Sequence, residues 1–305
     1  MTSKNFNISF EIFPARSEDA ERQMTQTLER LAVFDPAFIS VTYGAGGSST
    51  DRTITTIERV RRQHATPIAG HLTTIGQTRA ETGSVIARYR QMGVKHIVAL
   101  RGDTGPGIKD NPEGHADAAE LVSAIRKQEG PSERSKISVA AYPDAHPASP
   151  SKAADVDNLV AKFDAGADQA ISQFFFMNAP FLRLRDKLAR RGVDKPLVAG
   201  ILPVNSFAQT RRMARRCKTR IPRYISRGFK HVANDDELSR MFAISLAVEQ
   251  IDNLIAEGVR DFHFYTLNRA DLTHTICGLI GSEAEAALRG DTARIPAGPL
   301  RVGTG

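Results

Sequence analysis

The sequence predicts an α/β fold, a (β/α)8 TIM barrel that forms one domain with an extra helix between its seventh and eighth strands. Eight short apolar runs recur along the chain, and their near-continuous apolar character is typical of parallel strands buried on both faces. Segments with helical spacing separate them. The 305 residues have room for eight βα units, which usually take about 250 residues. A doubly wound open sheet is the alternative interpretation of the same alternation.

The eight expected strands are rich in apolar and β-branched residues, and each ends in polar or turn-forming residues. They cover residues 7–14, 38–44, 68–74, 96–103, 137–143, 169–176, 197–204 and 261–268. Successive strands start 28–41 residues apart, except that the last two starts are 64 residues apart. This longer interval leaves room for the extra helix.

The segments between the strands carry helical periodicity and helix-end signals. In residues 17–34, Met24, Leu28 and Leu31 recur three or four residues apart among charged residues, which is typical of a helix with one buried face. Four of the expected helices are each followed by a glycine, as is common at helix C-termini. These glycines are Gly93, Gly166, Gly192 and Gly258.

The composition is that of a soluble globular protein, with 41% hydrophobic and 25% charged residues. This excludes disordered, collagenous and fibrous classes. The net charge of +7 favours anionic partners without choosing among them. Two cysteines, no signal-peptide pattern and no apolar run of about 20 residues lead us to expect a cytoplasmic protein that does not span a membrane.

No linker divides the chain, so we expect a single barrel domain over residues 1–282. Residues 283–305 show no periodic pattern and end in a Pro- and Gly-containing stretch. We expect them to form a mobile C-terminal tail.

Polar residues gather where the expected strands end. Active sites of TIM barrels lie at the C-terminal ends of the strands, and polar side chains inside a barrel are costly unless they are paired or used. The residues at these ends are Glu11, Thr42, Tyr43, His71, Arg101, Gly102, Asp103, Tyr142, Gln173, Asn268 and Arg269. We therefore expect the site here.

Glu11 is an isolated carboxylate within an apolar run. Such surroundings raise the pKa of a carboxyl group, as a general acid working near neutral pH requires. A purely structural pairing with an arginine of the barrel is the equal alternative.

Two glycine-containing loops follow expected strands, at residues 43–49 and 102–107. Neither has the G-x-G-x-x-G spacing of a Rossmann dinucleotide site or the Lys-Ser/Thr ending of a P-loop. Arg101 and the amides of the second loop suit phosphate oxygens or a polarised ring edge. Two simpler interpretations stay open, namely a tight βα turn for the first loop and an Arg101–Asp103 structural pair for the second.

The histidines and cysteines show no metal-binding spacing. There is no H-E-x-x-H, and Cys217 and Cys277 lie far from any zinc-ligand pattern. We therefore expect no metal. For His71 and His263 the sequence favours packed, hydrogen-bonded barrel residues over ligands.

Residues 195–234 contain ten Lys or Arg and no acidic residue. The default interpretation is a solvated helix face, and the functional alternative is an anion-attracting wall beside the seventh strand. No zinc finger, RNA-recognition motif or aromatic interleaving accompanies the charge, so we expect no nucleic-acid partner.

Nine sequence blocks, in unbroken order, carry a resemblance to a known family. They are residues 9–14 (SFEIFP), 40–45 (SVTYGA), 51–53 (DRT), 70–73 (GHLT), 96–103 (HIVALRGD), 139–143 (VAAYP), 173–176 (QFFF), 200–203 (GILP) and 261–269 (DFHFYTLNR). Together they resemble methylenetetrahydrofolate reductase. The length is similar to that of the short bacterial form, without the regulatory domain of the eukaryotic proteins.

The resemblance implies an FAD-containing barrel that reduces 5,10-methylenetetrahydrofolate to 5-methyltetrahydrofolate in one-carbon and methionine metabolism. In the family, NADH or NADPH passes hydride to FAD and leaves, and the folate then takes its place in a ping-pong sequence. The folate ring opens to an iminium, and the flavin delivers hydride to that carbon. The family also suggests a homo-oligomer, although the sequence leaves the oligomeric state and the choice between NADH and NADPH open.

The resemblance also implies residue roles. Glu11 is similar to the general acid for ring opening, and Asp103 to the carboxylate whose charge stabilises the iminium and tunes the flavin. The implied folate contacts are Glu11, Asp103, Gln173, Gln209 and Arg269. The implied FAD contacts are Thr42, Tyr43, Ala45, His71, Arg101, Gly102, Asp103, His115, Ala116, Tyr142, His146, Asp155, Asn158 and Lys162.

The spacing of Asp155, Asn158 and Lys162 allows one helical face to present all three, as a plain surface helix would also do. Two positions depart from the family pattern. Met213 stands where some relatives have a Phe that packs on the folate or nicotinamide, and His115 stands where relatives carry Tyr.

Two other functions stay open from the sequence. One is a colourless folate-binding barrel that transfers a one-carbon unit without flavin. The other is a basic, non-catalytic protein that binds nucleic acid with a steep salt dependence.

Overall fold

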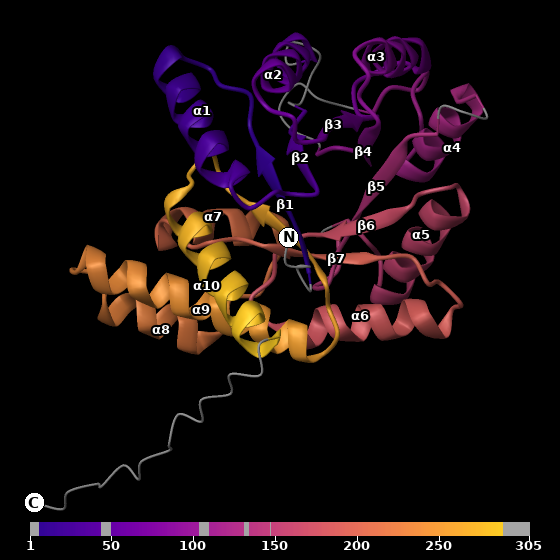
Figure 1. Ribbon diagram of the computed structural model, residues 1–305. Coiled ribbons are helices and arrows are strands. Elements are labelled where there is room, and N and C mark those ends of the chain that lie inside the picture. Colours follow the sequence, from indigo (N-terminus) through magenta and orange to yellow (C-terminus); the bar gives the residue numbers. More distant parts are fainter. Residues whose placement is uncertain (1–5, 44–49, 104–109, 131–133, 147, 289–305) are drawn as a thin grey trace, which may run out of the picture.

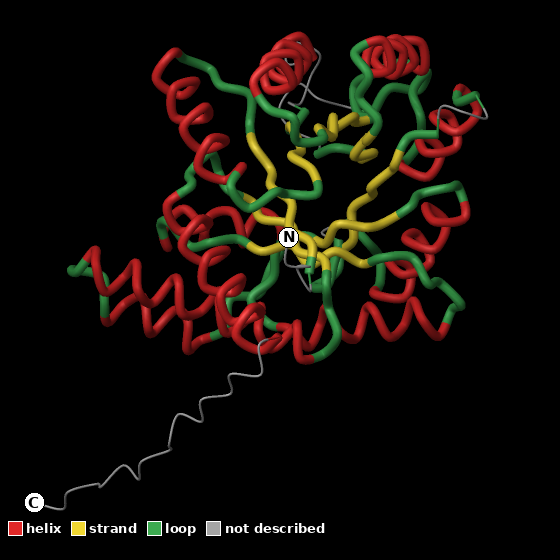
Figure 2. The backbone as a smooth tube through the Cα atoms, viewed as in Figure 1, coloured by secondary structure: helices red, strands yellow, loops and turns green. Residues whose placement is uncertain are grey.

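The computed structural model is a closed barrel of eight parallel strands that pair in sequence order, with β8 closing against β1. It describes residues 6–43, 50–103, 110–130, 134–146 and 148–288. Figure 1 and Figure 2 show the strands inside a ring of helices. The predicted TIM barrel is confirmed, and the open doubly wound sheet is excluded because the first and last strands pair and leave no edge strand.

The strands are β1 (Asn7–Ile12), β2 (Phe38–Val41), β3 (Ile68–Thr73), β4 (His96–Leu100), β5 (Lys136–Ala141), β6 (Gln169–Ser172), β7 (Leu197–Ile201) and β8 (Asp261–Tyr265). The helices are α1 (Glu18–Ala32), α2 (Thr50–Gln63), α3 (Arg79–Gln91), α4 (Ala118–Gln128), α5 (Lys152–Asp164), α6 (Asn178–Arg190), α7 (Phe207–Cys217), α8 (Arg223–His231), α9 (Asp236–Ala256) and α10 (Asp271–Leu288). Most predicted strands end earlier than expected, because their last residues turn into the loops of the site.

Three helices, α7, α8 and α9, lie between β7 and β8, two more than a single βα unit needs. The sequence predicted one extra helix, and this count was wrong by one. Lys218 ends α7 in the left-handed backbone region with a φ of 52°, and Pro222 directly precedes α8. These two residues divide the basic segment of residues 195–234 between two helices, although its charge pattern is continuous.

The last helix, α10, includes residues 283–288, which the sequence assigned to the tail. The rest of the predicted tail, residues 289–305, lies outside the described residues.

The four predicted helix-ending glycines all have positive φ, at 68° for Gly93, 113° for Gly166, 74° for Gly192 and 85° for Gly258. Glycine adopts this conformation without the steric cost that a Cβ brings. The predicted helix ends are confirmed at these positions.

Outward-facing strand residues and the helices form the main hydrophobic core, in which Phe10, Ile39, Val139 and Phe262 are fully or almost fully buried. This arrangement follows from strands whose alternate side chains face the helices. No helix in the described part of the chain combines the length and the apolar character that crossing a membrane requires.

The interior of the barrel, in contrast, contains a buried polar layer. His263 Nδ1 is hydrogen-bonded to Ser9 Oγ at 2.7 Å, and His96 Nε2 to Ser138 Oγ at 2.7 Å. The ring of Phe38 packs on both imidazoles, with ring centroids 4.3 Å from His96 and 5.6 Å from His263. His263 and His96 are thus packed, hydrogen-bonded residues that fill the barrel beneath the strand ends.

Candidate functional site

Glu11 lies on β1 at the C-terminal end of the barrel and is only 9% exposed. Its Oε2 lies 3.6 Å from Nε2 of His71 on β3. Burial raises the pKa of Glu11 to about 8 and lowers the pKa of His71 to about 3. At neutral pH the carboxyl group therefore holds its proton beside a neutral imidazole. The structural alternative, a barrel arginine paired with Glu11, is not observed among the described residues.

Tyr265 at the end of β8 is a site residue that the sequence prediction missed. It pairs in register with Glu11 across the β8–β1 seam, and its hydroxyl donates to the backbone carbonyl of Ser172 at 2.8 Å. Burial and the nearby Glu11 raise the pKa of Tyr265 well above its usual value. The period-two pattern of β8 contained the signal, since Tyr265 shares the inward face with His263.

Asp103 follows β4 and is exposed. Its charge is close enough to raise the pKa of Tyr142, after the larger effect of burial, and also acts on His146. Arg101 does not pair with Asp103: its Nη2 donates to both carboxylate oxygens of Asp110, at 2.8 and 2.9 Å. The open Arg101–Asp103 interpretation therefore does not hold, and no side chain of the described residues forms a hydrogen bond or ion pair with the Asp103 carboxylate.

Gly102, between these two residues, is required by the backbone. Its φ is 90°, and a Cβ added there would lie 2.6 Å from Cγ2 of Ile75. The turn thus directs Arg101 and Asp103 to different neighbours.

The helix α5 and the loop before it contribute a second group of predicted residues. Asp155 Oδ2 accepts from the backbone N–H of His146 at 2.6 Å, and the ring of His146 meets that of Tyr142 with centroids 4.6 Å apart. Lys162, in the last turn of α5, donates to the carbonyl of Ala140 at 3.0 Å. Burial lowers the pKa of Lys162, while Asp155 opposes this shift. The third predicted member, Asn158, is exposed.

At the ends of β2 and β3, Tyr43 is tied into the protein. Its hydroxyl is hydrogen-bonded to Thr50 Oγ1 at 2.5 Å and donates to Gln77 Oε1 at 3.1 Å. The carbonyl of Thr42 accepts from Thr53 Oγ1 at 3.0 Å. Ala45 lies outside the described residues, as do parts of both predicted glycine-containing loops.

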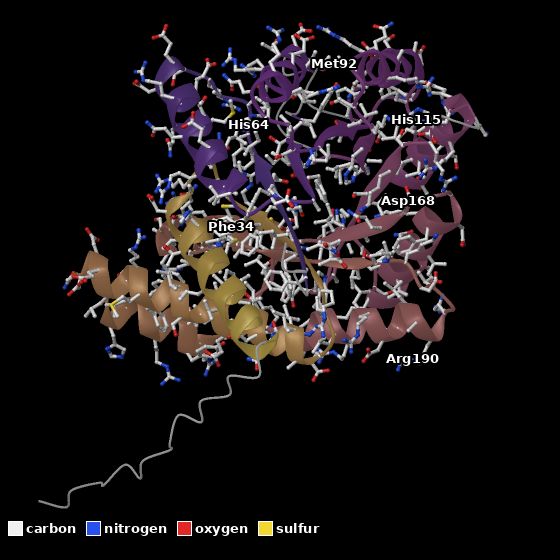
Figure 3. All side chains as sticks on the ribbon, viewed as in Figure 1. Phe34, His64, Met92, His115, Asp168 and Arg190 are labelled. Atoms are coloured by element: carbon white, nitrogen blue, oxygen red, sulfur yellow. The ribbon has the colours of Figure 1, made fainter. Side chains whose placement is uncertain are left out.

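Two buried imidazole nitrogens near the strand ends have no hydrogen-bond partner within the described part of the chain, His71 Nε2 and His115 Nδ1. His115 lies before α4 (Figure 3), where the next residue, Ala116, donates its N–H to Glu120 Oε2 at 2.7 Å. A buried polar atom without a partner is costly, and most such atoms in folded proteins are satisfied. These two nitrogens therefore mark places that suit a polar ligand.

Three predicted folate residues come from the segments that follow β6, β7 and β8. Gln173 is half-buried after β6, and its Oε1 accepts from the N–H of Phe174 at 3.0 Å. Gln209 is half-buried on α7, and Arg269 is exposed after β8. Met213, one helical turn after Gln209, packs against an apolar cluster that includes Phe174. Met213 thus belongs to this cluster and Gln173 directly precedes its member Phe174, whereas no side-chain hydrogen bond joins Gln209 or Arg269 to it in the described residues.

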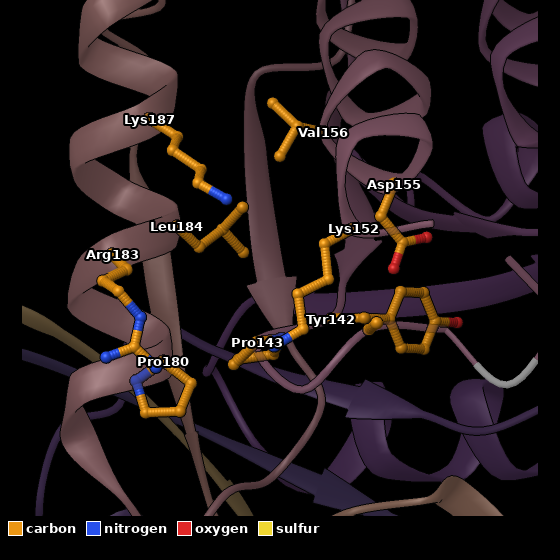
Figure 4. A pocket seen from close by; sticks show the side chains of 10 residues that line it. Tyr142, Pro143, Lys152, Asp155, Val156, Pro180, Arg183, Leu184 and Lys187 are labelled. Atoms are coloured by element: carbon orange, nitrogen blue, oxygen red, sulfur yellow. The ribbon is translucent and has the colours of Figure 1, made fainter. Parts of the chain in front are cut away.

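Two neighbouring hollows lie beside the loop after β5 and share Tyr142, Pro143 and Ala145. One is the groove between α5 and α6, seen in Figure 4. It is lined by Tyr142, Pro143, Ala145, Lys152, Asp155, Val156, Pro180, Arg183, Leu184 and Lys187. The other hollow reaches Gln173 and Cys217. Residues implied for FAD and for folate therefore border one continuous region of loops.

The end of β1 is fastened to the segment after β8, which is a second feature that the sequence did not predict. Thr266 Oγ1 donates to the carbonyl of Glu11, and the side chain of Asn268 binds both backbone groups of Phe13. Asn268 was noted at a strand end, but a contact between residues 255 apart leaves no local sequence signal.

The remaining charged groups form no further site of this kind. Among the described residues, no three His, Cys, Asp or Glu side chains lie together as metal ligands do. The four arginines of α7, at 211, 212, 215 and 216, are all exposed.

Comparisons with known proteins agree with this geometry. The family model described as methylenetetrahydrofolate reductase matches residues 1–281. The chain is 41% identical over 275 residues to 5,10-methylenetetrahydrofolate reductase of Salmonella typhimurium (strain LT2) and 40% identical over 275 residues to that of Escherichia coli (strain K12), with 90% of each chain covered in both comparisons. Methylenetetrahydrofolate reductase (NADH) 1 of Arabidopsis thaliana is 32% identical over 272 residues, which are 85% of this chain and 46% of that protein.

A solved structure shares the fold. It is an uncharacterised protein from Clostridium thermocellum that binds two copies of 5-methyl-5,6,7,8-tetrahydrofolic acid, and it matches with a TM-score of 0.62 at 14% identity over 92% of this chain and 96% of that one. The family match covers nearly the whole described barrel, including the strand ends where Glu11 and Asp103 lie. The chain belongs to the methylenetetrahydrofolate reductase family.

Proposed function

We propose that this protein reduces 5,10-methylenetetrahydrofolate to 5-methyltetrahydrofolate, with NADH or NADPH as reductant and FAD bound at the C-terminal ends of the strands. One observation carries the proposal beyond family membership. Glu11 is a buried carboxyl group at these ends whose pKa, raised by burial to about 8, keeps it protonated at neutral pH. A general acid needs this state, because it must hold a proton until the reaction takes it.

The residues present fit FAD. The two buried imidazole nitrogens without partners, on His71 and His115, both belong to the set that the family resemblance implies for this cofactor. Lys162 is a partly buried cation near Asp155, which suits the phosphate region of a dinucleotide. When bound, FAD supplies reversible two-electron hydride chemistry, which no protein side chain provides.

In this mechanism Glu11 donates its proton to the folate nitrogen that leaves the bridging carbon, and the C–N bond to that nitrogen breaks. The carbon is then a cationic iminium, and the exposed carboxylate of Asp103 stabilises the positive charge. Addition of hydride to the iminium carbon completes the methyl group. Overall, one hydride and one proton are consumed, and the reduced nicotinamide is oxidised.

The substrate is held by residues that follow β6, β7 and β8. Gln173, Gln209 and Arg269 come from three different βα segments, so they are able to contact one extended ligand at several points. The side chain of Tyr265 is fixed by its hydrogen bond to the Ser172 carbonyl and borders the site next to Glu11.

The visible absorption of the purified protein without air tests the proposal. We expect flavin bands that bleach when NADH or NADPH is added and return when methylenetetrahydrofolate follows. A colourless protein that takes up no FAD would refute the reductase function. If that protein still bound tetrahydrofolate, a folate-binding barrel without flavin would replace it.

A further inference from the structure

The turn after β8 contains two adjacent residues in the left-handed backbone region. Leu267 has a φ of 53° and Asn268 a φ of 54°. The N–H of Arg269 donates to the carbonyl of Thr266 at 3.0 Å, which closes the turn. Leucine rarely adopts this conformation, and strained residues of this kind persist where surrounding contacts fix them, often at functional sites.

The contacts that fix this turn come from the start of the chain. Asn268 Oδ1 accepts from the N–H of Phe13 at 2.8 Å, and its Nδ2 donates to the Phe13 carbonyl at 2.9 Å. The carbonyl of Asn268 accepts from Thr27 Oγ1 of α1 at 2.9 Å. Thr266 Oγ1 donates to the carbonyl of Glu11 at 2.6 Å and accepts from the N–H of Asn268 at 3.1 Å.

These contacts extend the strand pairing past its normal end. The register between β1 and β8 stops at Glu11 and Tyr265. Beyond it, the side-chain amide of Asn268 takes the place of a strand peptide, because it offers one acceptor and one donor to the two backbone groups of Phe13. On its β8 side, Glu11 is therefore held by the last paired residue of that strand and by the turn that follows.

The same turn directs three neighbouring side chains to three places. Leu267 packs on the apolar cluster of Phe174 and Leu202, Asn268 binds β1, and Arg269 is exposed. A single turn thus sets the positions of Glu11 and Arg269 relative to each other.

We propose that Asn268 is a positioning residue, which fastens the end of β1 to the turn after β8 and so holds the Glu11 carboxyl group and the Arg269 guanidinium in one geometry for the folate step. This role rests on the proposed function, in which Glu11 is the acid and Arg269 a folate contact. Reduction of FAD by the nicotinamide needs neither residue, so the two half-reactions respond differently when Asn268 is changed.

The test uses variants that separate the side chain from the backbone conformation. Asn268→Gly keeps the left-handed turn accessible but removes both bonds to Phe13. Asn268→Asp keeps an acceptor for the Phe13 N–H but has no donor for its carbonyl. Asp35→Gly is the matched control, because Asp35 also has a positive φ, of 44°, and is exposed before β2 at the other end of the barrel.

Both half-reactions are followed by rapid mixing of the FAD-loaded protein, and deuterium uptake is followed in the peptide that contains Phe13. In Asn268→Gly we expect re-oxidation by methylenetetrahydrofolate to slow at least tenfold and the folate dissociation constant to rise. Reduction by NADH should stay within twofold, and the Phe13 amide should exchange faster. Asn268→Asp should be intermediate, and Asp35→Gly should match the wild type.

Two results would overturn the proposal while leaving the reductase function intact. One is an equal slowing of both half-reactions in Asn268→Gly with a lowered melting temperature, which would indicate a merely structural role. The other is faster exchange at Phe13 with an unchanged folate step. If instead the wild-type flavin were not re-oxidised by the folate, the proposed function would fail and the positioning role with it.

Discussion

Glu11 and His71 show how burial alone sets the protonation of two groups that, in water, would form an ion pair. Their nearest polar atoms lie 3.6 Å apart, and desolvation shifts both pKa values toward the neutral forms. The uncharged pair leaves a proton on the carboxyl group, which is the state that a general acid requires.

Glu11→Gln should abolish folate reduction while leaving reduction of the flavin by NAD(P)H largely intact, because glutamine keeps the shape of the side chain but has no acidic proton. In the wild type, the folate step should decline as the pH rises past about 8, where Glu11 ionises. Rapid-mixing measurements of each half-reaction across this pH range provide the check. Equal losses in both half-reactions of the variant would contradict the assignment of the acid.

Asp103→Asn should slow the folate half-reaction by about 10- to 100-fold, since it removes a negative charge next to the developing cation. Asp110→Asn is a suitable control because Asp110 is also a carboxylate of this loop and pairs with Arg101. A folate step as fast as that of the wild type would show that the charge of Asp103 plays no electrostatic part.

Among the elements, β6 and β7 approach each other closely at Gly200. A Cβ there would lie 2.1 Å from the carbonyl oxygen of Ser172 and 2.8 Å from Cε2 of Tyr265. This carbonyl also accepts the hydrogen bond of the Tyr265 hydroxyl. The absence of a side chain at one strand position therefore allows the tyrosine beside Glu11 to occupy its place.

Gly200→Ala should lower the free energy of unfolding by about 3 kcal/mol, because backbone atoms cannot yield as a flexible side chain can. Gly192→Ala is the control for a glycine without close neighbours: its φ is positive, at 74°, unlike that of Gly200, but nothing lies within 4 Å, so it should cost only about 1 kcal/mol. Urea unfolding of the two variants measures the difference. Similar losses would mean that the strands separate easily at Gly200.

The sequence was sufficient for features that are local. Gly93 and Gly166 marked helix ends, and near-continuous apolar runs located the strands, because each depends on neighbouring residues. The division of the basic segment at Lys218 and Pro222 was missed, since charge masked the break between helices. The bonds of Asn268 could not be predicted, because they join the segments that follow the first and last strands, whose residues lie 255 apart in the sequence.

At the scale of the whole molecule, buried titratable groups make stability depend on pH in two opposite ways. Burial lowers the pKa values of His71, His96 and His263 to about 3. Below pH 6.5 these histidines bind protons in the unfolded chain but stay neutral in the folded protein. Stability is therefore lost as the pH falls. The raised pKa of Glu11 acts the other way, because its contribution is present below pH 4.5 and is lost as the pH rises through about 8.

As the pH falls from 7.5 to 5.5, the three histidines together should lower the free energy of unfolding by roughly 4 kcal/mol. The raised pKa of Glu11 should offset more than half of this loss. Glu11→Gln should therefore lose clearly more stability than the wild type over this interval. Urea unfolding of both proteins at the two pH values measures the effect, and the comparison between them isolates Glu11. Parallel losses would mean that the carboxyl group stays ionised in the folded protein over the whole interval, down to pH 5.5.

The packed layer of His96, His263 and Phe38 determines how ligands enter and leave the site. These side chains fill the interior of the barrel beneath Glu11, so the site opens only at the C-terminal ends of the strands. Every ligand that reaches Glu11 must enter and leave over the same rim. Under the proposed function, the reductant and the folate therefore share one entrance to the site.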